Sequence, residues 1–235
     1  MERTGVWKQG CPVALERLSV LKTRFVDFDG VEHEDGEIVV LDACTGAVAE
    51  IFERLYEMRF PINSMLGLHH FDGDDDRAME ANNTSCFNYR SIDGSATISM
   101  HSYALAIDLN PLQNPYLIFD EEGGTARIHP KAGWEYLNRY NRKPGMVEDL
   151  RPLFAEAGFS VWGGSWTTPL DYHHFQTPRA VAALLAVMSA DDGRRFYELV
   201  RRAPEKAQAL QPGEETEKLK AIYERSPAEL FEKLG

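Results

Sequence analysis

The sequence predicts an α+β fold that ends in a helical extension. Strand and helix patterns are mixed over residues 1–176, whereas helix patterns alone occur over 177–235. The chain has 235 residues, and at about 150 residues per domain this length predicts one large domain, or one domain with an appendage. We therefore expect a mixed domain over 1–176 and a helical C-terminal extension over 177–235.

Hydrophobic periodicity predicts the elements of the mixed part. Alternating apolar residues indicate strands, and apolar residues at every third or fourth position indicate helices. The first strand leads into Asp29-Gly30, and the second follows the turn signal Asp35-Gly36. Thr45 is the expected N-cap residue of the first helix. The predicted elements are two strands within 19–41, strands at 105–109 and 159–162, and helices at 46–58 and 147–157.

After Gln176 the pattern is helical throughout. Thr177 and Pro178 form an N-cap and first-turn pair, and Ser226 and Pro227 form another. The predicted helices begin at 178 and cover 192–203, 214–224 and 227–233. We expect these amphipathic helices to cap the domain, with a protein partner or dimer formation as the alternatives.

The overall charge excludes several classes of function. The chain carries 25 Lys and Arg against 37 Asp and Glu, a formal charge of -12. Nucleic acids and anionic membranes require clustered basic residues, so neither is expected as a partner. No apolar run reaches the length of a membrane span, and the N-terminal residues lack the apolar segment of a signal peptide. Three cysteines without a CxxC pair indicate neither a disulfide scaffold nor a cysteine zinc site.

A first group of residues that suggests chemistry lies between Ser99 and Asp108. His101 and Asp108 are seven residues apart, and Asp108 lies inside an otherwise apolar strand. A buried carboxylate needs a cation or hydrogen-bond donors to offset its desolvation. A divalent metal is one interpretation, and turn amides near Asn110 are the other; spacing alone favours the turn amides.

A second group follows a Trp162–Trp166 segment and contains Asp171, His173 and His174. Catalytic zinc sites use three protein ligands, an open fourth position for water, and a separate carboxylate as general base. His101, Asp108 and either His173 or His174 would supply the three ligands. Asp171 would then remain as the general base.

Taken in order, these motifs resemble the D-Ala-D-Ala carboxypeptidase/VanY-type zinc peptidases. The family pattern S-x-H-x-x-G-x-A-x-D is followed there by W-G-G-x-W and D-x-x-H-F, and residues 82–90 agree as well. The chain is most similar to the branch that contains phage-type L-alanyl-D-glutamate endopeptidases. The resemblance covers about residues 10–176. It implies a hedgehog/DD-peptidase-like zinc peptidase domain that binds one Zn²⁺ ion.

The resemblance also implies roles for individual residues. His101, Asp108 and His174 match the zinc ligands, and Asp171 matches the catalytic acidic residue. Arg90 matches the arginine that assists at the scissile carbonyl. The expected substrate contacts are Ser99, Asn83, Tyr89 and Trp166, of which the serine is a hydrogen-bond support rather than a nucleophile.

The sequence departs from the family pattern at two positions. Ala104 replaces the motif glycine, which matters if the backbone there needs a positive φ. Gln176 follows Phe175 where many relatives have Glu. Outside the pattern, His69-His70 is expected as a surface or loop pair, and Asp72–Asp76 as a solvated acidic loop.

The expected function is therefore zinc-dependent hydrolysis of amide bonds in peptidoglycan stem peptides. The bond would be L-Ala–D-Glu in an endopeptidase or the terminal D-Ala in a carboxypeptidase, and the motifs do not separate the two. The alternative is a zinc-stabilised cell-wall-binding or interaction domain without turnover. Because peptidoglycan lies outside the inner membrane, the expected location is periplasmic or extracellular, and the sequence shows no export route.

Overall fold

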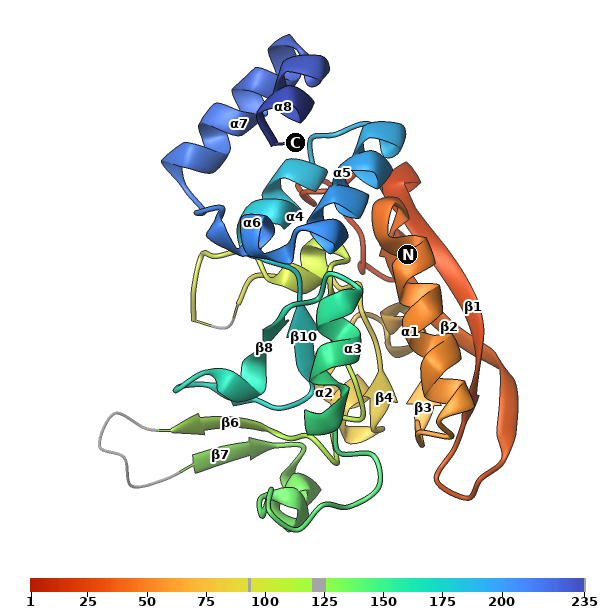
Figure 1. Cartoon of the computed structure of the whole chain (residues 1–235). Coiled ribbons are helices and arrows are strands. Elements are labelled where there is room, and N and C mark those ends of the chain that lie inside the picture. The colour runs from red at the N-terminus through yellow and green to blue at the C-terminus, as the bar shows by residue number, and fades with distance from the viewer. Residues whose placement is uncertain (93, 120–125, 235) are drawn as a thin grey trace.

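The computed structural model describes residues 1–92, 94–119 and 126–234 (Figure 1). Its strands are β1 (Leu18–Val26), β2 (Glu32–Leu41), β3 (Ser64–Met65), β4 (Asn83–Thr84), β5 (Ala106–Asp108), β6 (Tyr116–Phe119), β7 (Ala126–His129), β8 (Val161–Trp162), β9 (Leu170–Asp171) and β10 (His174–Gln176). Its α-helices are α1 (Thr45–Glu57), α2 (Asp75–Glu80), α3 (Arg151–Glu156), α4 (Arg179–Leu185), α5 (Ala190–Arg202), α6 (Pro204–Ala209), α7 (Glu214–Arg225) and α8 (Pro227–Leu234). The mixed α/β class predicted from the sequence is confirmed.

A long antiparallel hairpin of β1 and β2 lies along one side of the molecule, with α1 beside it (Figure 1). The end of β2 is buried residue after residue from Glu37 to Leu41, so both of its faces are covered. Helix α1 buries Val48, Ile51 and Phe52, the apolar positions at helical spacing. The two strands and the first helix are confirmed, although the N-cap residue is Cys44 rather than Thr45. The turn signal at Asp35-Gly36 is wrong, because Gly36 lies inside β2 and pairs with Thr23. The chain turns at residues 27–31 instead, where Gly30 has a φ of 79°.

Two small antiparallel sheets carry most of the residues that the motifs singled out. One has the order β5-β10-β8, and the other has the order β7-β6-β9. In the first sheet His174 lies opposite Asp108, so residues distant in the sequence become neighbours across a strand pair. The predicted strand at 105–109 is confirmed as β5, and the one at 159–162 is shorter, as β8. Strand β10 was not predicted.

The C-terminal helices α4–α8 gather at the end of the molecule away from β6 and β7 (Figure 1). Their buried side chains, among them Leu184, Phe196 and Leu230, belong to the same hydrophobic core as Phe52 of α1 and Phe154 of α3. A unit that ended at residue 176 would therefore lose part of its core. The boundary between 176 and 177 stays a prediction.

The surface of the described tail gives no support to the predicted dimer. Within residues 177–234, Val187 is the one large hydrophobic side chain that is exposed. The apolar faces of α7 and α8 are occupied, since Leu219, Tyr223 and Phe231 are buried in the core. In the described chain, no helix is long and apolar enough to cross a membrane.

Candidate metal centre and active site

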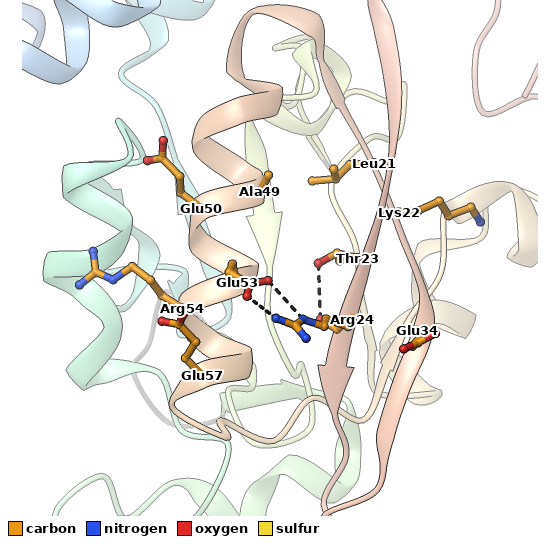
Figure 2. Close-up of a pocket in the computed structure, with 10 residues that line it drawn as sticks. All are labelled: Leu21, Lys22, Thr23, Arg24, Glu34, Ala49, Glu50, Glu53, Arg54 and Glu57. Carbon is orange, nitrogen blue, oxygen red and sulfur yellow. Dashed lines mark hydrogen bonds and ion pairs between the residues drawn. The ribbon is translucent and has the colours of Figure 1, made fainter.

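The residues of the two predicted groups line a single cavity of about 550 Å³. Its walls come from α2, the short 3-10 helix η4 (Met100–Tyr103), strands β5, β6, β7, β9 and β10, and the start of α4. A larger hollow of about 760 Å³ lies on the surface between β1 and α1 (Figure 2). That hollow contains none of the predicted site residues, and its Arg24 is already paired with Glu53.

Three buried side chains converge on one point of the cavity: His101 from η4, Asp108 from β5 and His174 from β10. Their potential ligand atoms all lie within 4.8 Å of one another. His101 Nε2 lies 3.1 Å from Asp108 Oδ2, and His174 Nδ1 lies 3.0 Å from Asp108 Oδ1. The two histidine nitrogens are 3.2 Å apart. The structure thus brings together the three residues that the resemblance implies as ligands.

Hydrogen bonds on the far side of each ring fix which histidine nitrogen faces inward. His101 Nδ1 donates to the Cys86 carbonyl oxygen at 2.5 Å, and His174 Nε2 donates to Gln176 Oε1 at 2.8 Å. In the neutral tautomer with the proton on the outer nitrogen, each ring presents a lone pair toward the Asp108 carboxylate. Three acceptors that face one another fit a bound cation.

The spacing of these acceptors also fits Zn²⁺. Two donors bound about 2.0 to 2.1 Å from a tetrahedral zinc ion are separated by about 3.3 Å. The two histidine nitrogens are 3.2 Å apart, and each lies 3.0 to 3.1 Å from one of the two Asp108 carboxylate oxygens. Imidazole and carboxylate groups are ordinary zinc ligands, so the residues present suit the metal that the resemblance implies.

The electrostatic environment keeps Asp108 ionised. Burial opposes the charged form, but His101 and His173 hold the pKa of the Asp108 carboxyl well below its ordinary value. Burial likewise opposes the charge on His174, whose pKa is nevertheless raised, chiefly by Asp108. A cation bound in the group would replace the proton that His174 Nδ1 shares with Asp108 and would offset the buried carboxylate charge in its place.

Asp171, at the end of β9, is held beside the group by the other histidine. His173 Nδ1 donates to the Asn114 carbonyl oxygen at 2.8 Å, and His173 Nε2 lies 2.9 Å from Asp171 Oδ1. Burial opposes the charge on His173, yet Asp171 and Asp108 raise its pKa to about 10. Asp171 Oδ2 faces the group, 3.9 Å from His174 Nδ1. The structure therefore groups His174 with His101 and Asp108, and places His173 against Asp171.

Among the other predicted residues, Arg90, Ser99 and Trp166 line the cavity. Arg90 Nη2 donates to Asp75 Oδ2 at 2.6 Å, and the Trp166 ring lies 5.5 Å from the His174 ring. Ser99 is the N-cap residue of η4, and its Oγ accepts from the His101 backbone N–H at 3.3 Å. Ser99 thus supports the segment that carries His101.

Two predicted substrate contacts lie elsewhere in the structure, outside the residues that line this cavity. The Asn83 side chain is buried and bonds to Ser64 and to both backbone polar groups of Leu66. It therefore clamps the β3–β4 pair. Tyr89 packs against the N-terminal segment, with Lys8 Nζ 5.6 Å from its ring centre. Their nearness to Arg90 in the sequence does not place them in the site.

Sequence reasoning missed several side chains that line the cavity. Asp75 begins α2, within the acidic run that was expected as a loop, and it pairs with Arg90. Arg127 on β7 and Arg179 at the start of α4 also line the cavity. No motif marks Arg127, and Arg179 lies in the predicted extension. The loop expected over Asp72–Asp76 is wrong in its second half, where α2 begins at Asp75. A helix forms there because the Asp74 side chain caps it by accepting from the Arg77 N–H at 3.0 Å.

Ala104 occupies the position where the family pattern has glycine. Its φ of 55° and ψ of 36° are left-handed, which explains the glycine of the pattern. Ala104 adopts this conformation at the end of η4 and donates to the His101 carbonyl oxygen at 3.0 Å. The substitution therefore leaves the turn between His101 and β5 intact.

A family model described as D-alanyl-D-alanine carboxypeptidase matches residues 93–177. The matched segment contains His101, Asp108, Asp171 and His174, whereas Arg90 lies just before it. No curated protein and no solved structure matches the chain. The resemblance to this peptidase family is confirmed over residues 93–177.

Proposed function

With the peptidase-family match over residues 93–177 as the premise, we propose that this chain is a zinc-dependent peptidase acting on peptidoglycan stem peptides. One observation carries the proposal. His101, Asp108 and His174 offer three inward-facing ligand atoms in a cavity, and the carboxylate of Asp171 stands beside them without belonging to the group. This is the arrangement that metal-assisted hydrolysis requires. We also propose that residues 1–176 adopt the hedgehog/DD-peptidase-like fold and that the chain is most similar to the branch with L-alanyl-D-glutamate endopeptidases.

His101 Nε2, an oxygen of Asp108 and His174 Nδ1 would hold one Zn²⁺ ion. When bound, zinc lowers the pKa of a water molecule and polarises a carbonyl group. The outer hydrogen bonds to Cys86 and Gln176 keep both rings in the tautomer that can bind the metal.

Asp171 is the proposed general base. Its Oδ1 is held by His173, which leaves Oδ2 on the side of the ligand group. Oδ2 would take a proton from the attacking water and return it to the leaving amine. His173, anchored on Asn114, fixes the orientation of the carboxylate throughout.

Arg90 is assigned to the negative charge that develops on the carbonyl oxygen. Its guanidinium lines the cavity, and the ion pair with Asp75 fixes one of its nitrogens. Because a guanidinium has five N–H donors in a plane, a contact with Asp75 is compatible with a second contact to substrate.

The cavity offers cationic side chains to a peptide that carries carboxylates, on a wall that also includes Asp74, Asp75 and Asp76. Arg127 and Arg179 line it together with Arg90, and Trp166 supplies an aromatic wall beside His174. Arginine pairs well with carboxylates, which stem peptides carry at D-Glu and at their C-terminus. The reaction would be either L-Ala–D-Glu cleavage or removal of the terminal D-Ala, outside the inner membrane in the periplasm or the extracellular space.

The test is digestion of purified muropeptides by the zinc-loaded chain, followed by mass spectrometry. Loss of a single D-Ala identifies a carboxypeptidase, and separation of L-Ala from D-Glu identifies an endopeptidase. Binding to sacculi without any cleavage would contradict the proposal and would favour a zinc-stabilised cell-wall-binding domain.

A further inference from the structure

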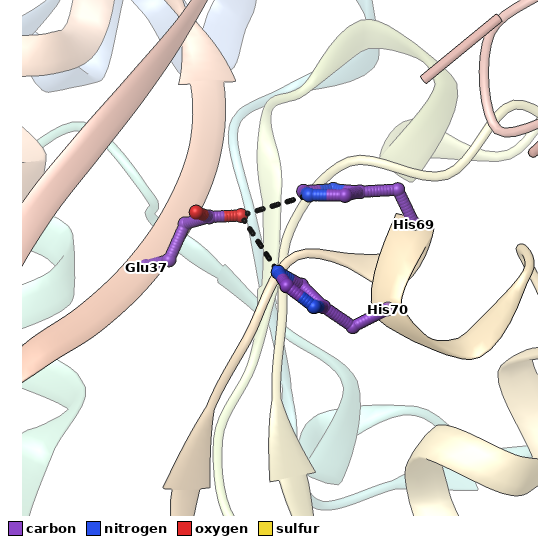
Figure 3. A group of neighbouring side chains, drawn as sticks. All are labelled: Glu37, His69 and His70. Atoms are coloured by element: carbon purple, nitrogen blue, oxygen red, sulfur yellow. Dashed lines mark ion pairs between the residues drawn. The ribbon is translucent and has the colours of Figure 1, made fainter. Parts of the chain in front are cut away.

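A second group of metal-ligand side chains lies outside the cavity. It consists of Glu37 on β2 together with His69 and His70 on the short 3-10 helix η3 (Leu68–Phe71) (Figure 3). Their potential ligand atoms also lie within 4.8 Å of one another. None of the three lines the cavity described above, and the proposed peptidase mechanism does not use them.

Both histidines turn a nitrogen toward the same carboxylate oxygen, as Figure 3 shows. His69 Nε2 lies 3.3 Å from Glu37 Oε1, and His70 Nε2 lies 3.6 Å from it. Both distances exceed the range of about 2.7 to 3.2 Å that is usual between the nitrogen and the oxygen of an N–H···O hydrogen bond. They lie close to the separation of about 3.3 Å between two ligands of a tetrahedral zinc ion.

The Glu37 carboxylate is buried and only half satisfied. Glu37 is 7% exposed, and its Oε2 forms an ion pair with Lys22 Nζ at 2.6 Å. Within the described residues, Oε1 has no hydrogen-bond partner. A buried carboxylate oxygen without a donor is costly, and Oε1 aimed at two imidazoles is arranged to share a bound cation with them.

Gly67 leaves the space that this group occupies. Its backbone has an ordinary φ of -61°, so conformational freedom does not explain the glycine. A Cβ atom at this position would stand 2.7 Å from Glu37 Oε1 and from the ring of His69. The absent side chain thus allows the carboxylate and the imidazole to approach each other.

We propose that Glu37, His69 and His70 form a second binding site for a divalent transition-metal ion, with Zn²⁺ as the expected occupant. Two imidazoles and one carboxylate are a usual zinc ligand set. His70 is half exposed, so the fourth position is open to water.

The second ion would join the β-hairpin to the wall of the peptidase cavity. It would tie β2 to η3, and η3 runs through the Asp72–Asp74 turn into α2. Asp75 at the start of α2 holds Arg90. The role assigned to this site is therefore structural: it holds in place the segment that positions Arg90.

The test measures the zinc content of the full chain. The protein is stripped with a chelator, reloaded with Zn²⁺, desalted and analysed for metal. The wild type is expected to retain two ions, and the His69→Ala/His70→Ala variant one. His33→Ala is the matched control, because His33 lies on β2 like Glu37 but pairs with Asp27 at 2.8 Å, outside the group. This control variant should retain two zinc ions.

Asp108→Asn separates the second site from the first. This variant should lose the ion of the cavity and keep one zinc, which also disappears when His69→Ala and His70→Ala are added. That result would support the second site whether or not the chain is a peptidase. Any result in which His69→Ala/His70→Ala retains as many ions as its parent overturns the proposal.

The single variant His70→Ala guards against a folding defect, because His70 is half exposed. Its thermal unfolding in chelator should match that of the wild type. In the Asp108→Asn background, zinc affinity should fall by more than about tenfold, because loss of even an outer-sphere partner costs about 10- to 100-fold. Unchanged affinity in a folded His70→Ala chain would overturn the proposal.

Discussion

Gln176 should control the zinc affinity of the cavity site without being a ligand. Its Oε1 accepts the outer N–H of His174 at 2.8 Å. This bond favours the tautomer in which Nδ1 is available to a metal ion. Gln176→Leu keeps a side chain of similar size but removes the acceptor. Gln176→Glu, the residue of many family members at this position, replaces the amide with a carboxylate.

The size of the effect follows from the hydrogen bond that is lost. His174 is buried, and leaving a buried donor unsatisfied costs about 1 to 3 kcal/mol. Outer-sphere partners of metal-bound histidines are worth about 10- to 100-fold in metal affinity, which corresponds to about 1.4 to 2.7 kcal/mol. We expect Gln176→Leu to weaken zinc binding by about 10- to 100-fold. Gln176→Glu should strengthen it, because hydrogen bonds to a charged acceptor are about twice as strong.

The assay is competition with a chromogenic zinc chelator at fixed pH. Both variants are made in the His69→Ala/His70→Ala background, so that only the cavity site is measured. Gln211→Leu, an exposed glutamine of the tail, is the matched control and should have no effect. Unchanged affinity in Gln176→Leu, or weaker binding in Gln176→Glu, would refute the reasoning.

Three further predictions concern the rest of the chain. All three cysteines are free, and burial raises the pKa of each thiol, but Cys44 and Cys86 are fully enclosed whereas Cys11 is partly exposed. A thiol reagent should therefore modify only Cys11 until denaturant is added; rapid reaction of Cys44 in the native chain would contradict this. Leu230 is fully buried, so Leu230→Ala should lower the free energy of unfolding by about 2 to 5 kcal/mol in a denaturant titration, and an unchanged transition would mean that α8 does not pack on the core. Deletion of 177–235 should abolish cooperative unfolding measured by circular dichroism, because α4 and α5 share the core; a folded 1–176 fragment would instead place the domain boundary where the sequence predicts it.

The elements that could be predicted from the sequence are those whose signals are local. The β1–β2 hairpin and helices α1, α5, α7 and α8 have clear periodicity or caps within their own residues. Strands β9 and β10 are two and three residues long, which is too short for a periodic pattern. Such strands exist only because a partner strand lies beside them, and pairing across the fold has no local signal.

The same distinction applies to the candidate site. The resemblance to the peptidase family implies that His101, Asp108 and His174 meet, and the structure places them together. The side chains that surround them come from separate elements, and their arrangement depends on tertiary packing. Asp75 and Arg179 therefore escaped prediction.

The neighbouring histidines 69 and 70 were expected as a surface or loop pair, because nothing in the sequence links them to Glu37. The histidines lie on η3 and Glu37 lies on β2, and these two segments come together only when the chain folds. Composition and spacing thus indicate chemistry within one motif, whereas a site assembled from two distant segments needs the structure.

Asp171→Asn tests the central claim most directly, when zinc content and muropeptide cleavage are measured on the same sample. Asn has nearly the shape of Asp, but its amide cannot act as a base at neutral pH. We predict that the variant retains the zinc of the wild type and loses about 10²- to 10⁴-fold in turnover, the usual contribution of a general base. Wild-type turnover in the zinc-loaded variant would contradict the role of Asp171, and loss of zinc would show that Asp171 belongs to the metal group.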